Sequence, residues 1–130
     1  MVRLILLALF CLINLFGFGQ TQSDLNEIAY KDYQKAEKRL NSVYQKILQE
    51  YKSDTAFIKN LKIAQKIWIQ FRHAEMRVKF PDTYLYGSSF PMCWSSYLAE
   101  LTDERTKKLR DWLKGTEEGD VCAGSVKRIE

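Results

Sequence analysis

Polar and apolar residues follow the period of amphipathic α-helices along most of the chain. Apolar side chains recur at steps of three and four residues from Leu25 to Tyr51, which places them on one face of a helix. We therefore predict a first helix from about Ser23 to Tyr51. Asp24 and Glu27 resemble a capping box at its start, with Asp in place of the usual Ser or Thr.

A second helix is expected from about Thr55 to Lys79, after a short polar break. Pro81 ends it, because proline cannot continue a helix and disfavours helical backbone at the residue before it. Its expected core-facing stripe consists of Phe57, Leu61, Ala64, Trp68 and Phe71, continued by Glu75.

The third helix is predicted from Met92 to Leu113, with Pro91 in its first turn and Gly115 as its stop. Residues 81–91 before it form a loop rich in aromatic residues. These either tuck onto the end of the bundle or form a binding surface. No segment alternates like a strand, so the predicted fold is all-α, a small antiparallel three-helix bundle.

The N-terminus has the pattern of a secretory signal peptide over residues 1–19. Arg3 is followed by an apolar run from Leu4 to Phe18 that contains one polar residue, Asn14, and Gly19 precedes a polar stretch. A retained membrane anchor is the alternative, although the run is shorter than the ~20 residues that a spanning helix needs. Phe10 before Cys11 argues against lipidation. We expect a periplasmic or secreted protein with a helical domain over 20–122 and a flexible tail over 123–130.

Charge argues against a nucleic-acid partner. Without Arg3, the chain keeps 19 basic and 16 acidic side chains, a net charge of +3, and the two signs are interleaved. A nucleic-acid-binding domain is typically more basic and has a continuous basic patch. Contact with a membrane is expected only transiently, through the signal peptide.

The two cysteines left after cleavage, Cys93 and Cys122, predict a disulfide in an oxidising compartment, with zinc binding or thiol chemistry as the alternative. A straight helix from 93 to 115 would span about 33 Å. The chain from 115 to 122 reaches back at most about 25 Å, and the bond allows about 6 Å between Cα atoms. These lengths do not close the loop, so we expect the third helix to bend or split near residue 102, where Thr102 could begin a new helix.

Gln65, Trp68 and Arg72 stand at steps of three and four residues on the second helix, and Glu75 continues the line. They therefore point the same way. One interpretation is a polar binding groove. The other is a half-buried structural seam in which Trp68 fills the core and Arg72 pairs with Glu75 or with an acid of the first helix.

The chain resembles the DUF1311 family, also called LprI-like after a mycobacterial lysozyme inhibitor. The resemblance rests on five stretches and covers most of residues 25–122: LNSVY (40–44), AQKIWIQFR (64–72), GSSFPMC (87–93), LTDERTKKL (101–109) and EGDVC (118–122). It implies a helical bundle, export and inhibition of lysozyme. The motif residues that it carries over are Leu40, Asn41, Tyr44, Gln65, Trp68, Arg72, Leu101, Thr102 and Arg105.

Two features depart from the family pattern. Members commonly have a cysteine in the first helix and a second one near position 76, where this chain has Met76. The absence of both cysteines is expected if they form one disulfide in other members and side-chain packing replaces that disulfide in this chain. His73 stands where an Asp often follows the Arg, and we interpret it as a solvated surface residue.

Two functions remain open from the sequence. The first is a binding module of the cell envelope directed at lysozyme or another wall hydrolase, through Glu117, Glu118 and Asp120 or through the loop aromatics. The second is a structural or stress-related envelope protein that self-associates or binds peptidoglycan, and its expected stacking residues are Tyr84, Tyr86, Phe90 and Trp94.

Catalysis is not expected, and neither is a cofactor or a metal site. His73 is the only histidine in the sequence and has no nucleophile signature near it. No pair of acids stands out as the two carboxylates that glycoside hydrolysis needs.

Overall fold

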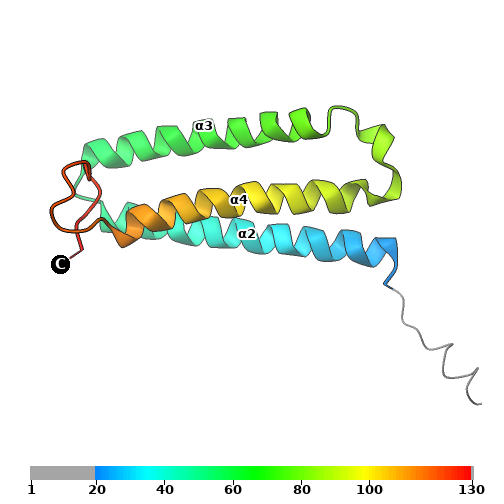
Figure 1. The fold of residues 1–130 in the computed structure, drawn as a ribbon, viewed down its shortest axis with the longest axis horizontal. Coiled ribbons are helices and arrows are strands. Elements are labelled where there is room, and N and C mark those ends of the chain that lie inside the picture. Colours follow the sequence, from blue (N-terminus) through cyan, green and yellow to red (C-terminus); the bar gives the residue numbers. More distant parts are fainter. Residues whose placement is uncertain (1–19, 130) are drawn as a thin grey trace, which may run out of the picture.

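The computed structural model describes residues 20–129 and arranges them as an up-down-up bundle of three long helices (Figure 1). These are α2 (Gln22–Glu50), α3 (Thr55–Lys79) and α4 (Phe90–Lys114), and the 3-10 segment η2 (Thr83–Ser89) joins the last two. The only β contact within this part of the chain is an isolated bridge between Thr116 and Arg128. The predicted all-α fold is confirmed.

Side-chain caps fix where the helices start. At α2 the capping box is formed by Thr21 and Asp24, whose side chains each accept from the other's backbone N–H, so the predicted Asp24–Glu27 box was placed three residues late. Asp54 caps α3 by accepting the N–H of Phe57 at 2.8 Å. Each cap satisfies a backbone donor that has no partner within the helix.

α2 and α4 pack closely along their length, whereas α3 lies farther out in the bundle (Figure 1). One apolar cluster, centred on Ile47 and Leu109, fills the end near the α2–α3 turn. A second, centred on Met76 and Phe80, fills the end near η2. Phe71, expected on the core-facing stripe of α3, is exposed instead.

The predicted break in the third helix is wrong, because α4 is one continuous helix from Phe90 to Lys114. Thr102 does not begin a new helix. Its hydroxyl donates to the carbonyl oxygen of Leu98 one turn earlier, at 2.6 Å, and its side chain is fully buried.

The predicted disulfide is also wrong. Cys93 lies in the first turn of α4 and Cys122 lies in the segment beyond its other end, and both thiols are free. A straight helix from Phe90 to Lys114 and a Cys93–Cys122 bond exclude each other, because the chain beyond the helix is too short to reach back. In the structure α4 is continuous, and Cys93 and Cys122 are not bonded to each other.

Hydrogen bonds dock the residues after α4 on the α2–α3 end of the bundle. Thr116 donates its N–H to the carbonyl of Lys127 at 2.8 Å, and the N–H of Lys127 donates to the hydroxyl of Tyr51 at 3.0 Å. Gly115 permits this close approach: its φ is +96°, and a Cβ there would lie 2.6 Å from the carbonyl oxygen of Lys127. Residues 123–129, expected as a flexible tail, thus make specific contacts, and Ala123 is buried.

Candidate functional site

A polar layer separates the two apolar clusters, and Arg72 is its centre. Arg72 comes from the C-terminal half of α3, and only 6 % of its surface is exposed. One Nη atom forms an ion pair with Glu37 of α2 and also donates to the hydroxyl of Thr102 on α4 at 2.8 Å. Arg72 therefore joins all three helices.

Trp68 extends this layer along α3. The guanidinium carbon of Arg72 lies 4.8 Å from the centre of the Trp68 ring, and that of Arg105 lies 6.0 Å from it. The indole face stabilises both cations. Arg105 also donates through Nε to the side-chain oxygen of Gln65 at 3.0 Å, which ties α4 to α3 a second time.

The layer does not satisfy all of its donors. Nε of Arg72 and one Nη atom of Arg105 are buried without a hydrogen-bond partner among residues 20–129. Burial lowers the pKa of Arg105. Arg72 pairs with Glu37, whereas Arg105 forms no ion pair within residues 20–129, so the layer holds two cations and one carboxylate.

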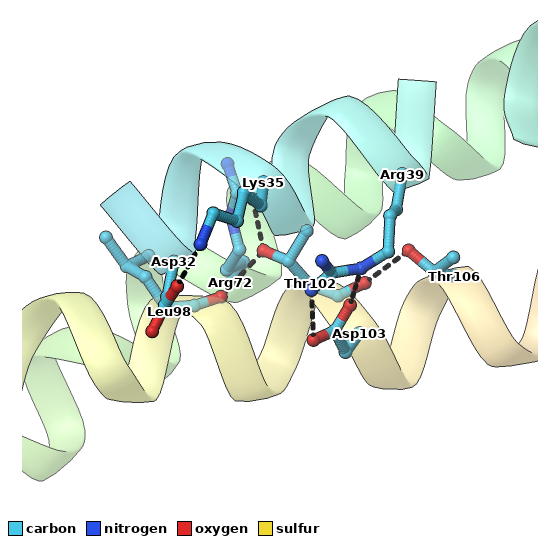
Figure 2. Close-up of polar contacts among 8 residues, drawn as sticks. All are labelled: Asp32, Lys35, Arg39, Arg72, Leu98, Thr102, Asp103 and Thr106. Carbon is cyan, nitrogen blue, oxygen red and sulfur yellow. Dashed lines mark hydrogen bonds and ion pairs between the residues drawn. The ribbon is translucent and has the colours of Figure 1, made fainter. Parts of the chain in front are cut away.

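The exposed edge of the α2–α4 interface carries a different kind of ion pair (Figure 2). Arg39 of α2 binds Asp103 of α4 through two hydrogen bonds, of 3.0 Å and 2.8 Å, while both side chains remain about half exposed. Thr106, one turn beyond Thr102 on the buried side, donates to the carbonyl of Thr102 at 2.8 Å. Thr102, which accepts from the buried Arg72, and Asp103, which pairs with the exposed Arg39, are thus adjacent residues of α4.

Eight residues were predicted for the seam or for the polar and aromatic part of the family motif, and the structure brings five of them together: Gln65, Trp68, Arg72, Thr102 and Arg105. The other three lie elsewhere. Glu75 accepts a hydrogen bond from the hydroxyl of Tyr97 at 3.3 Å, Tyr44 packs against the cluster of Ile47 and Leu109, and Asn41 is exposed.

Sequence reasoning did not single out Glu37, although it left open that an acid of the first helix pairs with Arg72. The signal was present in the sequence. Glu37 follows Tyr33 by four residues and precedes Leu40 by three, so it interrupts the apolar stripe of α2 with a carboxylate. Burial, followed by the charge of Glu37, raises the pKa of Tyr33.

The loop aromatics divide into one exposed residue and a packed group. Tyr84 is 94 % exposed. Tyr86 and Phe90 pack edge-on against Phe80 at centroid distances of 5.4 Å and 5.8 Å, and Trp94 lies 5.9 Å from the same ring. Of the residues proposed for stacking on a glycan, only Tyr84 therefore projects freely into solvent.

The predicted acidic contact residues lie at the other end of the bundle, in the segment after α4. Glu117 and Glu118 are exposed. Asp120 is half-buried, and its carboxylate accepts the N–H of Cys122 at 2.8 Å, which orders the turn. The segment η2, which contains Tyr84, and the segment after α4 lie at opposite ends of the bundle (Figure 1). Tyr84 and the acidic turn of residues 117–120 therefore do not form one site.

The part of the chain that the structure describes contains no group of three or more His, Cys, Asp and Glu side chains suited to a metal ion. None of its helices is long and apolar enough to cross a membrane. Within the polar layer, the ion pair, hydrogen bonds and cation–π contacts of Arg72 and Arg105 all join one helix of the bundle to another or run along α3.

Comparison with known families assigns the chain. Residues 18–109 match the family described as lysozyme inhibitor LprI. The chain belongs to this family. The match includes the complete polar layer and the aromatic end of the bundle, whereas the acidic turn lies beyond the matched residues.

Two relatives agree with this assignment to the LprI family. An uncharacterized protein of Rhizobium meliloti (strain 1021) is 32 % identical over 108 residues, which cover 75 % of this chain and 77 % of that protein. The crystal structure of a DUF1311 family protein from Pseudomonas putida KT2440 matches with a TM-score of 0.58 at 25 % identity, over 69 % of this chain and 91 % of that chain. The predicted family resemblance is confirmed.

Proposed function

We propose that the protein is an exported binding module of the cell envelope that inhibits a lysozyme-type wall hydrolase by occupying it, without catalysis. The observation that carries this proposal is the match of residues 18–109 to the lysozyme inhibitor LprI family. The signal-peptide pattern of residues 1–19 supports export. Because the polar layer is internal, we expect the contact to lie on the surface.

Charge selects the acidic turn as the contact surface. Lysozymes are typically basic, and a partner steered by charge should present exposed acids. Glu117 and Glu118 are exposed and have no ion-pair partner within residues 20–129. Asp120 holds the turn that displays them. This turn would enter or cover the active-site cleft.

A turbidity assay tests the proposal. Lysozyme clears a suspension of bacterial cell walls, and titration with the protein should slow the clearing. The variant Glu117→Gln/Glu118→Gln/Asp120→Asn should inhibit about tenfold more weakly, because charge complementarity across the interface is lost. The variant keeps the turn, since Asn at position 120 retains the oxygen that accepts the N–H of Cys122.

A control variant removes the same number of negative charges elsewhere, two of them from acids that pair with lysines one turn away. Glu27→Gln/Asp32→Asn/Glu104→Gln neutralises three exposed acids on α2 and α4 and should inhibit like the unmodified protein. If micromolar protein does not slow clearing, the inhibitor proposal fails for that lysozyme. Equal weakening by the two triple variants would refute the acidic turn as the contact.

A second candidate is binding to peptidoglycan, favoured by the exposure of Tyr84 at the η2 end of the bundle. A freely exposed tyrosine is suited to stacking on a sugar ring. Insoluble peptidoglycan should then retain the protein, and Tyr84→Ala should release it, while Tyr30→Ala on the exposed face of α2 should not. Retention without inhibition of lysozyme would favour this function over the first.

A further inference from the structure

The outward face of α3 carries an apolar stripe that nothing in the bundle covers. Ile63, Ile67, Phe71 and Val78 are between 49 % and 76 % exposed, and Ala74 between them is exposed as well. Their spacing of four, four, three and four residues places them in one line along the helix. We call these five residues the outer stripe. A continuous exposed apolar patch on a small protein indicates an interaction surface.

A row of cations runs beside the outer stripe. Lys59, Lys62, Lys66 and Arg77 are exposed and form no ion pair within residues 20–129; we call them the basic band. Three of them directly precede a stripe residue in the sequence, so the band and the stripe lie about 100° apart around the helix. Both therefore face away from the bundle together.

The outward face of α3 carries no acid. Glu75 is the only acidic residue of the helix, and it is turned towards the hydroxyl of Tyr97 on α4. The two remaining basic residues of α3, Arg72 and Lys79, contact residues of α2 and α4. Arg72 pairs with Glu37, and Nζ of Lys79 lies 3.5 Å from the centre of the Tyr97 ring. The four side chains of the basic band are thus exposed and unpaired within residues 20–129.

We propose that the outer stripe and the basic band bind the surface of a bilayer that contains anionic phospholipids. The stripe would enter the boundary between headgroups and acyl chains, and the band would contact the lipid phosphates. α3 suits this role because it is long, lies farthest out in the bundle and can rest along a flat surface (Figure 1). This site is distinct from the acidic turn, and its test does not depend on inhibition of lysozyme.

Other partners fit the surface less well. A soluble polyanion would neutralise the basic band but would leave the outer stripe in water. A second copy of the chain would cover the stripe, yet with residues 1–19 removed each copy has a net charge of +3, which opposes contact between two basic bands. A bilayer with anionic headgroups satisfies both the apolar and the charged half of the surface.

Cosedimentation with vesicles tests this proposal. The protein, purified in its exported form, should sediment with vesicles of phosphatidylglycerol and phosphatidylcholine at low salt, but not with pure phosphatidylcholine. Added salt should weaken the binding, because it screens exposed charges. Neutralising the band with Lys59→Gln/Lys62→Gln/Lys66→Gln should weaken partition roughly a hundredfold. Ile67→Ser/Phe71→Ser should weaken it more than about tenfold.

Matched variants separate this surface from overall charge and hydrophobicity. Lys38→Gln/Lys46→Gln/Lys52→Gln removes three exposed charges that also lack ion pairs, and Ile28→Ser/Tyr30→Ser removes two exposed apolar side chains of α2. Both should bind vesicles like the unmodified protein.

Three results would overturn the proposal. The first is that the protein does not bind anionic vesicles. The second is that the band variant and its lysine control lose vesicle binding equally. The third is that the protein forms a dimer, which Ile67→Ser/Phe71→Ser dissociates, and does not bind vesicles. The last result would assign the outer stripe to a second copy of the chain.

Discussion

Replacing Arg72 by methionine tests whether the polar layer holds the three helices together. Arg72→Met keeps an unbranched side chain of similar length but removes the guanidinium. Glu37 then loses its ion-pair partner while only 30 % of its side chain is exposed, and the hydroxyl of Thr102 loses a donor. The Trp68 ring loses the cation that lies 4.8 Å from its centre.

The structure sets the expected size of this effect. Breaking a fully buried ion pair by removing one partner costs about 3–5 kcal/mol. Water reaches part of Glu37, which lowers this cost, whereas the lost cation–π contact adds about 1 kcal/mol. We therefore expect Arg72→Met to lower the free energy of unfolding by about 2–3 kcal/mol.

Urea unfolding followed by far-UV circular dichroism measures this loss through a lower midpoint at an unchanged slope. A double-mutant cycle with Glu37→Gln should give a coupling energy of about 1–2 kcal/mol between the two side chains. The exposed pair of Arg39 and Asp103 provides the control (Figure 2). Arg39→Met should cost less than about 1 kcal/mol, because water and salt screen an exposed pair.

The result that would refute this reasoning is equal destabilisation by Arg72→Met and Arg39→Met. A coupling energy between Arg72 and Glu37 that cannot be distinguished from zero would also refute it. The polar layer would then be tolerated by the fold without joining its helices.

Three further predictions follow from the contacts described. Cys93→Ser/Cys122→Ser should leave the melting temperature unchanged, and both native thiols should react with a maleimide in a mass-spectrometric assay; a stable oxidised form with both thiols blocked would contradict the structure. Tyr51→Phe removes the hydroxyl that accepts the N–H of Lys127, so amides of residues 123–129 should exchange hydrogen faster than in the unmodified protein. Burial raises the pKa of Tyr33 above its ordinary value of 10.0, so folding favours the protonated form. Its contribution to stability is complete below pH 10 and is lost as the pH rises through the higher folded-state pKa. Tyr33→Phe should therefore unfold less steeply with alkali than the unmodified protein, and an identical alkaline unfolding curve would contradict this.

The sequence was sufficient where one local signal decided the outcome. Helical periodicity located all three long helices to within a few residues, because the apolar step of three and four reflects the geometry of the helix itself. Pro81 and Gly115 marked the ends of α3 and α4, because each restricts or frees the backbone at its own position. The motif residues identified the family for the same reason, since they are read directly from the chain.

The expected disulfide shows where sequence reasoning failed. The number of cysteines and the expected oxidising compartment predicted a disulfide. That bond requires the third helix to break, and Thr102 was the expected site of the break. In the structure the helix is continuous and the disulfide is absent. The Thr102 hydroxyl bonds to Leu98 one turn back, so the residue continues α4 instead of capping a new helix.

The sequence by itself determined the elements, the family and the line of Gln65, Trp68 and Arg72 along one face of α3. Only the tertiary structure decided which acid pairs with Arg72, which aromatic side chains are free and which apolar residues of α3 stay in solvent. The physical reason is that α3 has two apolar lines and periodicity cannot tell them apart. Contact with α2 and α4 covers the line that includes Trp68, and the line that includes Phe71 remains exposed.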